Sequence, residues 1–211
     1  MILETSDQRT EDWYAARLGK ATASRFRDAI AALKSGAPAQ AQRDYLTELV
    51  VERLTQQPIQ RFQNAAMNWG TEQEPAARAA YERVTGRIVE ETGFVAHDTL
   101  MAGCSPDGLI DWDGLIEIKC PWGTAVHIET LLNGMPSDHI PQVQGQLWIT
   151  GREWCDFVSY DPRMPEALQL HVQRIPRDEA FIADLERRVT SFLAEVGNQV
   201  EALRRLAESK K

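Results

Sequence analysis

The chain has 211 residues, of which 43% are hydrophobic and 26% are charged, and its formal net charge at pH 7 is −8. This composition is typical of one globular domain, or at most two small ones, and excludes an intrinsically disordered chain. No apolar run approaches the roughly 20 residues that span a bilayer, so we expect no membrane association.

The acidic net charge by itself disfavours a nucleic-acid partner, because Lys and Arg carry the binding of phosphate groups. The basic residues are unevenly spread, however, and several lie in the first part of the chain: Arg17, Lys20, Arg25, Arg27, Lys34 and Arg43. The sequence is therefore compatible with a local basic face.

The three cysteines, Cys104, Cys120 and Cys155, are odd in number and dispersed. They predict neither a disulfide framework nor a site with four thiolate ligands for zinc or an iron–sulfur cluster. The N-terminus lacks the basic and then apolar pattern of a signal peptide, so we expect a cytoplasmic protein.

The first part of the chain is predicted to be helical. Apolar residues recur at helical spacing over 21–33, 43–56 and 71–86, and Gly86 ends the third segment. Residues 34–42 contain Gly and Pro and are expected to form a loop.

The rest of the chain alternates strands with two helices. Strands are expected over 87–96, 101–104, a hairpin within 103–121, 153–161 and 167–174. Helices are expected over 139–151 and, as a long amphipathic segment, over 177–209. With no internal repeat or composition break, residues 1–211 are predicted to form a single α/β (α+β) domain with a central mixed β-sheet flanked by helices.

The hairpin segment GCSPDGLIDWDGLIEIKCP places charged residues where a hairpin does not need them. A three-residue loop, Trp112–Gly114 with Gly114 left-handed, would pair residue 107 with 119 and 109 with 117. Strand alternation would then put Asp107, Glu117 and Lys119 on one face, with the two acids as diagonal neighbours about 7–8 Å apart.

These residue types suit a metal-assisted reaction. Two carboxylates and a backbone carbonyl give Mg²⁺ the hard oxygen ligands that it prefers, and an ammonium group nearby can orient water or stabilise charge on a phosphate. By spacing alone, Glu117 and Lys119 could equally be a solvent-facing ion pair on a strand.

The sequence resembles the lambda-phage-type exonuclease (YqaJ-like) branch of the PD-(D/E)xK nuclease superfamily. Six stretches in order carry the resemblance: WYAARLGKATAS (13–24), WGTEQEPAARAAYE (69–82), CSPDGLI (104–110), EIKCP (117–121), PQVQGQLWITG (141–151) and FVSYDPRM (157–164). The resemblance implies a restriction-endonuclease-like core.

By position, the resemblance implies that Asp107 and Glu117, with the carbonyl of Ile118, ligate a metal ion beside Lys119. Glu74 would complete the metal site, and Gln142 would face it from a helix. From the residues alone, Glu74 also fits a capping box that begins at Thr71.

The resemblance further implies a pocket for a 5′-terminal phosphate, formed by Arg17, Ser24 and Ser105. Lys34 would contact the DNA duplex, and Met67 would act as an apolar wedge that opens its end. Asp98 is the nearest match to a further acidic residue of the family, at a spacing one residue short.

The implied activity is a Mg²⁺-dependent 5′→3′ exonuclease, with Mn²⁺ as a substitute metal. It would act on linear double-stranded DNA, release 5′-mononucleotides and leave 3′ single-stranded tails. The family further implies a homotrimeric ring and a single-strand annealing protein as a partner.

Two alternatives stay open. A structure- or sequence-specific endonuclease could use the same fold, although an internal cut offers no terminal phosphate to Arg17, Ser24 and Ser105. A non-catalytic DNA-binding module would not need Asp107, Glu117 and Lys119.

Overall fold

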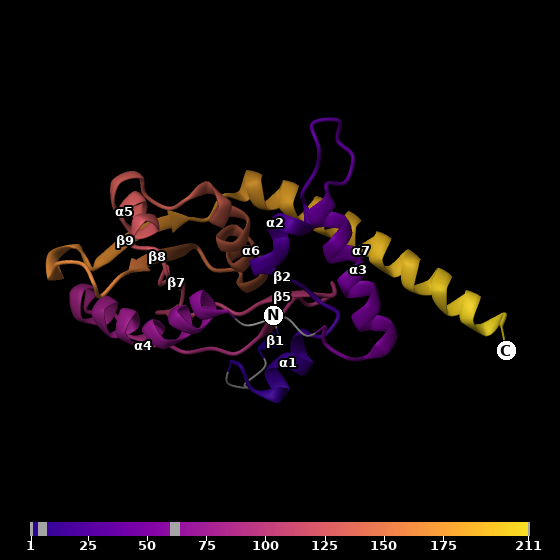
Figure 1. Cartoon of the computed structure of the whole chain (residues 1–211), viewed down its shortest axis with the longest axis horizontal. Helices are drawn as coiled ribbons and strands as arrows, with labels where there is room; N and C mark the ends of the chain where they lie inside the picture. The colour runs from indigo at the N-terminus through magenta and orange to yellow at the C-terminus, as the bar shows by residue number, and fades with distance from the viewer. Residues whose placement is uncertain (1, 4–7, 60–63, 211) are drawn as a thin grey trace.

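Two β-sheets organise the chain, whose computed structural model describes residues 2–3, 8–59 and 64–210 (Figure 1). The larger sheet has the strand order β3-β6-β7-β8-β9, and its one parallel pair is β7 with β8. Its strands are β3 (Val89–Glu90), β6 (Gly108–Ile110), β7 (Gly114–Lys119), β8 (Trp154–Tyr160) and β9 (Leu170–Pro176). The predicted central mixed sheet flanked by helices is thereby confirmed.

The smaller sheet has the order β1-β4-β5-β2. Its strands are β1 (Ile2–Leu3), β4 (Val95–Ala96), β5 (Ala102–Cys104) and β2 (Ala21–Thr22). Because β2 pairs with β5, the stretch 13–24 that contains β2 lies next to Ser105, which directly follows β5.

The helices cover both faces of the larger sheet and form a separate layer beside it (Figure 1). They are α1 (Glu11–Arg17), α2 (Phe26–Ala29), α3 (Gln40–Thr55), α4 (Ala65–Thr85), α5 (Thr124–Asn133), α6 (Ile140–Thr150) and α7 (Glu179–Glu208), with the 3-10 turns η1 (Ala23–Arg25), η2 (Ser137–His139) and η3 (Glu166–Leu168). None of the described helices combines the length and apolar character of a membrane span.

Alternation along β7 decides which helix each of its side chains meets. Ile116 and Ile118 are buried together with Ala77 and Tyr81 of α4, while Leu115 is buried together with Val143 and Leu147 of α6. Glu117 has the parity of Leu115 and therefore points toward α6.

The predicted register of the hairpin is wrong by two residues. Leu109 pairs with Leu115 and Ile110 with Gly114, so the loop is 111–113. Asp111, with φ 49°, takes the left-handed conformation predicted for Gly114, which instead begins β7. A shift of two residues keeps every side chain on its face, so the predicted shared face does not depend on the corrected register.

Two predicted helices also need correction. The segment 21–33 holds β2, η1 and the four-residue α2, and Leu33 is exposed. Helix α4 begins at Ala65 rather than near residue 71, because the Asn64 side chain caps it by accepting from the Met67 amide and the helix continues through Pro75. Helices α1 and α5 were not predicted.

The long C-terminal helix is confirmed in its main part. Helix α7 runs over Glu179–Glu208, packs along α3 and extends beyond the rest of the chain (Figure 1). Phe192 stacks on Tyr45 of α3 with ring centroids 5.5 Å apart. Leu203 is exposed on the projecting end.

Candidate active site

Asp107 and Glu117 meet where the β6–β7 hairpin opens toward its chain ends. Extending the register by one residue sets Asp107 opposite Glu117. The Asp107 amide donates to the carbonyl of Ile116 at 3.2 Å, and its carboxylate Oδ2 accepts from the Ile118 amide at 2.6 Å. Backbone contacts at both ends of Asp107 therefore fix its carboxylate beside β7.

Glu117 is only 2% exposed, and hydrogen-bond donors reach both of its carboxylate oxygens. Lys119 Nζ and Gln142 Nε2 donate to Oε1, the second at 2.6 Å, and Gln146 Nε2 donates to Oε2 at 2.6 Å. Lys119 Nζ also lies 3.4 Å from Gln142 Oε1. The structure thus brings together Glu117, Lys119 and Gln142, as the sequence predicts, and adds Gln146.

Asp107 and Glu117, together called the acidic cluster below, lie close enough for their charges to interact. Burial and then the Glu117 charge raise the pKa of Asp107 well above its usual range, against a smaller opposing effect of Lys119. Burial lowers the pKa of Lys119, but the charges of Glu117 and Asp107 outweigh burial and leave it raised. Lys119 is therefore an ammonium at neutral pH.

Glu74 lies on α4, near enough for its charge to contribute to the raised pKa of Asp107. Its carboxylate is held by Arg9 at 2.6 Å and by Arg78 at 3.2 Å. Since Glu74 falls in the middle of α4, the capping-box interpretation is wrong. Glu74 faces the acidic cluster from the neighbouring helix and is paired with arginine.

The donor set suits a hard divalent cation. The carboxylates of Asp107 and Glu117 lie at opposed strand positions, and a cation between them would relieve the repulsion that burial strengthens. Within the described parts of the chain, no group of three or more His, Cys, Asp or Glu is arranged as a metal site. Asp107 and Glu117 form a smaller set, a pair of carboxylates of the kind that a hard divalent cation prefers.

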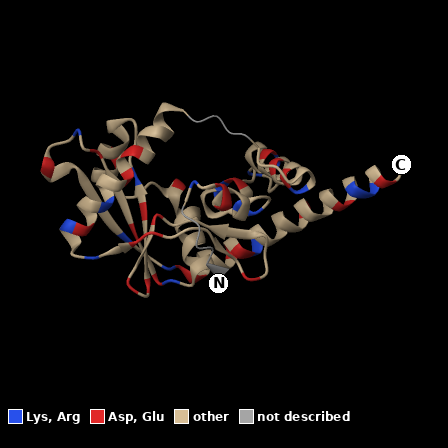
Figure 2. Cartoon of the chain, turned by 90° about the horizontal axis from the view of Figure 1, so that it is seen from below, with Lys and Arg blue, Asp and Glu red and all other residues tan. Residues whose placement is uncertain are grey.

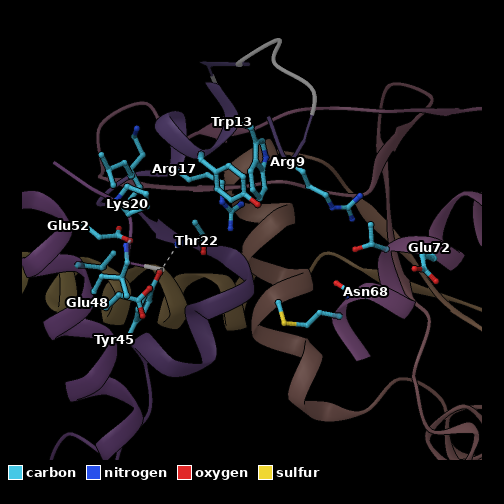
Figure 3. Close-up of a pocket in the computed structure, with 17 residues that line it drawn as sticks. Arg9, Trp13, Arg17, Lys20, Thr22, Tyr45, Glu48, Glu52, Asn68 and Glu72 are labelled. Atoms are coloured by element: carbon cyan, nitrogen blue, oxygen red, sulfur yellow. Dashed lines mark hydrogen bonds between the residues drawn. The ribbon is translucent and has the colours of Figure 1, made fainter. Parts of the chain in front are cut away.

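A compact cluster is formed by Arg17, Trp13 and Ser105. Within it, Ser105 lies two residues before Asp107 in the chain. Arg17 Nη1 donates to Ser105 Oγ at 3.0 Å, and Trp13 Nε1 donates to the same oxygen at 2.9 Å. The Arg17 guanidinium lies 4.1 Å from the Trp13 ring centroid, and both side chains line a cavity of about 750 Å³ (Figure 3). Because Ser105 Oγ accepts twice, its own proton is available to donate to a third group.

Ser24 contacts Thr22, which lines the same larger cavity as Arg17 and Trp13. Ser24 is exposed within η1, its Oγ is 3.3 Å from Thr22 Oγ1, and it lines a second cavity of about 610 Å³ together with Gln142. Arg17 thus contacts Ser105 directly, and Ser24 lies between the two cavities, because its partner Thr22 lines the larger one and Ser24 itself lines the smaller one.

The remaining predicted residues lie around the two cavities or farther out. Met67, half exposed near the start of α4, lines the larger cavity. Lys34 lies in the exposed loop between α2 and α3, which projects from the top of the molecule (Figure 1). Asp98 lies in the exposed turn between β4 and β5, and it is not a hydrogen-bond partner of Glu117 or Lys119.

Two residues of the site were not predicted. Trp13 stands in the stretch 13–24 that carries the resemblance, but it was given no role in the site. Gln146 follows Gln142 by four residues, so helical periodicity alone could have placed both on one face.

Comparisons with known proteins show what the chain is similar to. A family model described as the YqaJ-like viral recombinase domain matches residues 12–153. LHK-Exo, an alkaline exonuclease from Laribacter hongkongensis, is 48% identical to this chain over 96% of this chain and 100% of its own. Its structure in complex with dAMP superposes with a TM-score of 0.89, and a second structure with 0.88.

Two more distant similarities were found. A phage related exonuclease from Haemophilus somnus 129PT is 16% identical, covers 87% of this chain and 96% of its own, and has a TM-score of 0.72, which supports the fold alone. A protein of Escherichia coli K12 named ExoD is 35% identical over 68 residues, which make up 29% of this chain and 77% of that protein.

Proposed function

Because the chain belongs to the YqaJ-like viral recombinase family, we propose that it is a Mg²⁺-dependent 5′→3′ exonuclease on linear double-stranded DNA. Each step would hydrolyse the terminal phosphodiester, release a 5′-mononucleotide and lengthen a 3′ single-stranded tail. The similar protein LHK-Exo was solved with dAMP, which is the kind of product that this reaction would release.

The observation that carries the proposal is the short distance along the chain between two functional clusters. Ser105, bonded to Arg17, is two residues from Asp107, which begins the acidic cluster. A guanidinium binds a phosphate through two parallel hydrogen bonds, and a serine proton adds a third. A phosphate held there would place a neighbouring phosphodiester near Asp107 and Glu117, so a strand end is favoured over an internal site.

The mechanism follows from the residues of the cluster. Asp107, Glu117 and the Ile118 carbonyl would hold a divalent cation, which when bound supplies Lewis-acid polarisation of the scissile phosphate. Lys119 carries its charge into the site and would stabilise the negative charge that develops on the phosphoryl oxygens as water attacks. Gln142 bonds both Lys119 and Glu117 and so sets their relative positions.

Roles for the outlying residues belong to the same proposal. Glu74 would support the metal site from α4, and Ser24 would bind the 5′-terminal phosphate together with Arg17 and Ser105. Lys34 and Met67 would contact the duplex and its opened end, and Asp98 is the weakest member of the set because it lies outside the acidic cluster. We place the reaction in the cytoplasm of a bacterial host, with a single-strand annealing protein receiving the tail.

The test is digestion of one linear duplex carrying either a 5′-phosphate or a 5′-hydroxyl, beside the same DNA as a closed circle. Each substrate is incubated with Mg²⁺ or with EDTA, using the wild type, Lys119→Met and Ser105→Ala. Lys119→Met keeps the side-chain length and removes the charge. It is expected to lower the turnover rate by about 100-fold or more, as loss of a group that stabilises the transition state does.

The pattern of the results separates the alternatives. Mg²⁺-dependent loss of the phosphorylated linear duplex, a spared circle and a reduced preference for 5′-phosphate in Ser105→Ala support the proposal. Cutting of the circle would replace it with an endonuclease. Binding of DNA without cutting, in Mg²⁺ and in Mn²⁺, would leave a non-catalytic module.

A further inference from the structure

The two oxygens of the Glu117 carboxylate lie in different surroundings. Oε1 receives Lys119 and Gln142, whose side chains are partly accessible, and Gln142 lines the smaller cavity. Oε2 receives Gln146, which is only 1% exposed and lies one helical turn further along α6. Oε1 therefore faces the open side of the site, and Oε2 faces the interior.

Among the described residues, the Gln146 side chain makes one hydrogen bond. Its Nε2 donates to Glu117 Oε2 at 2.6 Å, while its Oε1 is buried without a hydrogen-bond partner. A buried amide that leaves its acceptor unsatisfied is unfavourable for stability, and a hydrophobic side chain of the same size would avoid that loss. We therefore attribute the presence of a glutamine at position 146 to its hydrogen bond with Glu117.

We propose that Gln146 is a positioning residue that fixes the orientation of the Glu117 carboxylate beside Asp107, where a divalent cation would bind. The inference rests on the proposed function, because it concerns the cation that Asp107 and Glu117 would hold. The last torsion of a glutamate is broad, so a carboxylate held at one oxygen alone can rotate. A donor on the buried oxygen removes that freedom before the cation arrives, which is how residues behind metal ligands raise affinity.

The chain offers a matched control on the same helix. Gln144 is 3% exposed, as buried as Gln146 to within a few per cent, but its hydrogen bonds go elsewhere. Its Nε2 donates to the carbonyl of Pro176 at 2.9 Å, and its Oε1 accepts from the Asp178 amide at 2.9 Å. Losing Gln144 therefore weakens the junction between β9 and α7 and leaves Glu117 untouched.

The experiment is calorimetric titration of Mn²⁺ into the wild type, Gln146→Met, Gln144→Met and Glu117→Gln, with a thermal melt of each to verify folding. Gln→Met keeps the side-chain length and removes the donor. We expect Gln146→Met to weaken Mn²⁺ binding by about 10–100-fold, in the range found for residues that orient metal ligands. Gln144→Met is expected to lower the melting temperature without changing the Mn²⁺ dissociation constant.

A second readout is the Mg²⁺ concentration that gives half-maximal DNA cleavage. Orientation of Glu117 predicts that Gln146→Met raises this concentration more than it lowers the rate at saturating Mg²⁺. If Gln146→Met binds Mn²⁺ as tightly as the wild type does, or if both glutamine variants weaken binding equally, the role given to Gln146 is wrong. If the wild type binds no Mn²⁺, or binds it unchanged when Glu117 is replaced, the proposed metal site itself is wrong, and the role of Gln146 with it.

Discussion

At the scale of single residues, Arg163 holds together the chain segments that end beside the acidic cluster. It donates to both carboxylate oxygens of Asp161 at 2.8 Å and to the carbonyls of Pro121 and Trp122 at 3.2 and 3.0 Å. Its guanidinium lies 4.6 Å from the Trp69 ring centroid of α4. Arg163 thus links the end of β7 to β8 and α4, which places Lys119 relative to Glu74.

The partner of Arg163 gives a prediction about stability and pH. Hydrogen bonds from Arg163 lower the pKa of Asp161 to about 2, against the opposing effect of burial. Replacing Asp161 with Asn removes the charge that receives these bonds, and we expect the free energy of unfolding at pH 7 to fall by about 1–3 kcal/mol, as when buried donors lose a partner. Urea denaturation measures this difference.

The pH dependence of the same difference has a definite sign. Because the folded pKa lies below the unfolded value of roughly 3.9, the carboxylate favours folding above about pH 4, and this contribution is lost as the pH falls toward 2. The stabilities of the wild type and Asp161→Asn should therefore converge over that window. Asp184→Asn, which removes an exposed acid paired with Arg187, serves as the control and should change little. A constant difference from pH 7 to pH 2 would contradict the assignment.

At the scale of elements, the β6–β7 hairpin and α6 build the site between them. Glu117 and Lys119 alternate with the buried residues Ile116 and Ile118, so the charged side chains face α6 and the apolar ones face α4. Gln142 and Gln146 lie one turn apart on α6, and both donate hydrogen bonds to the Glu117 carboxylate. Side chains on one face recur every second residue along a strand and about every fourth residue along a helix. Each of the two elements therefore presents two members of this network to the other.

The start of β7 depends on the absence of a side chain at residue 114. A Cβ atom on Gly114 would lie 2.2 Å from two ring atoms of Trp154, which is held against Arg174 at 3.6 Å. We expect Gly114→Ala to lower the free energy of unfolding by about 1–3 kcal/mol, the range for overpacking a core. Urea denaturation measures the change.

Gly197 in α7 is the matched control for Gly114. No atom lies within 4 Å of a Cβ built on Gly197, and the residue is inside a helix. Gly197→Ala should therefore raise the free energy of unfolding by roughly 0.5–1 kcal/mol. Equal effects of the two substitutions would show that the close approach of Trp154 does not limit residue 114.

At the scale of the whole molecule, the charge distribution poses a problem for a DNA enzyme. The net charge is −8, and on the projecting end of α7 acidic and basic residues are interspersed (Figure 2). Basic side chains that could contact DNA phosphates lie in a few places, such as Arg17 and Lys20 at the larger cavity. A ring closed around its substrate would need only such a local basic lining, because the DNA cannot diffuse away.

The expectation of a homotrimeric ring, which comes from the family resemblance, can be tested by mass. Light scattering coupled to size-exclusion chromatography should give about three times the chain mass of 23.8 kDa. A trimer should also degrade a long duplex over many steps after a challenge with competitor DNA. A stable monomer that cleaves DNA would contradict the ring and would leave the acidic charge without this explanation.

The sequence by itself determined the class of the fold, and it led to the proposed chemistry of the site. Asp107, Glu117 and Lys119 could be chosen because strand alternation and metal-ligand preference are local rules that hold before the chain folds, whereas Gln142 came from the family resemblance. The hairpin was located correctly even though its register was wrong by two residues, because that error preserves the facing of every side chain.

Only the tertiary structure decided which distant groups meet. Ser105 receives Trp13 and Arg17 because β2 pairs with β5, and Glu117 receives Gln146 because α6 packs over β7. The start of α4 at Ala65, six residues before the predicted one, likewise depends on a cap and on packing that let a helix continue through Pro75. Contacts between residues about 30 to 90 positions apart depend on how whole elements pack, and local patterns of hydrophobicity carry no information about that distance.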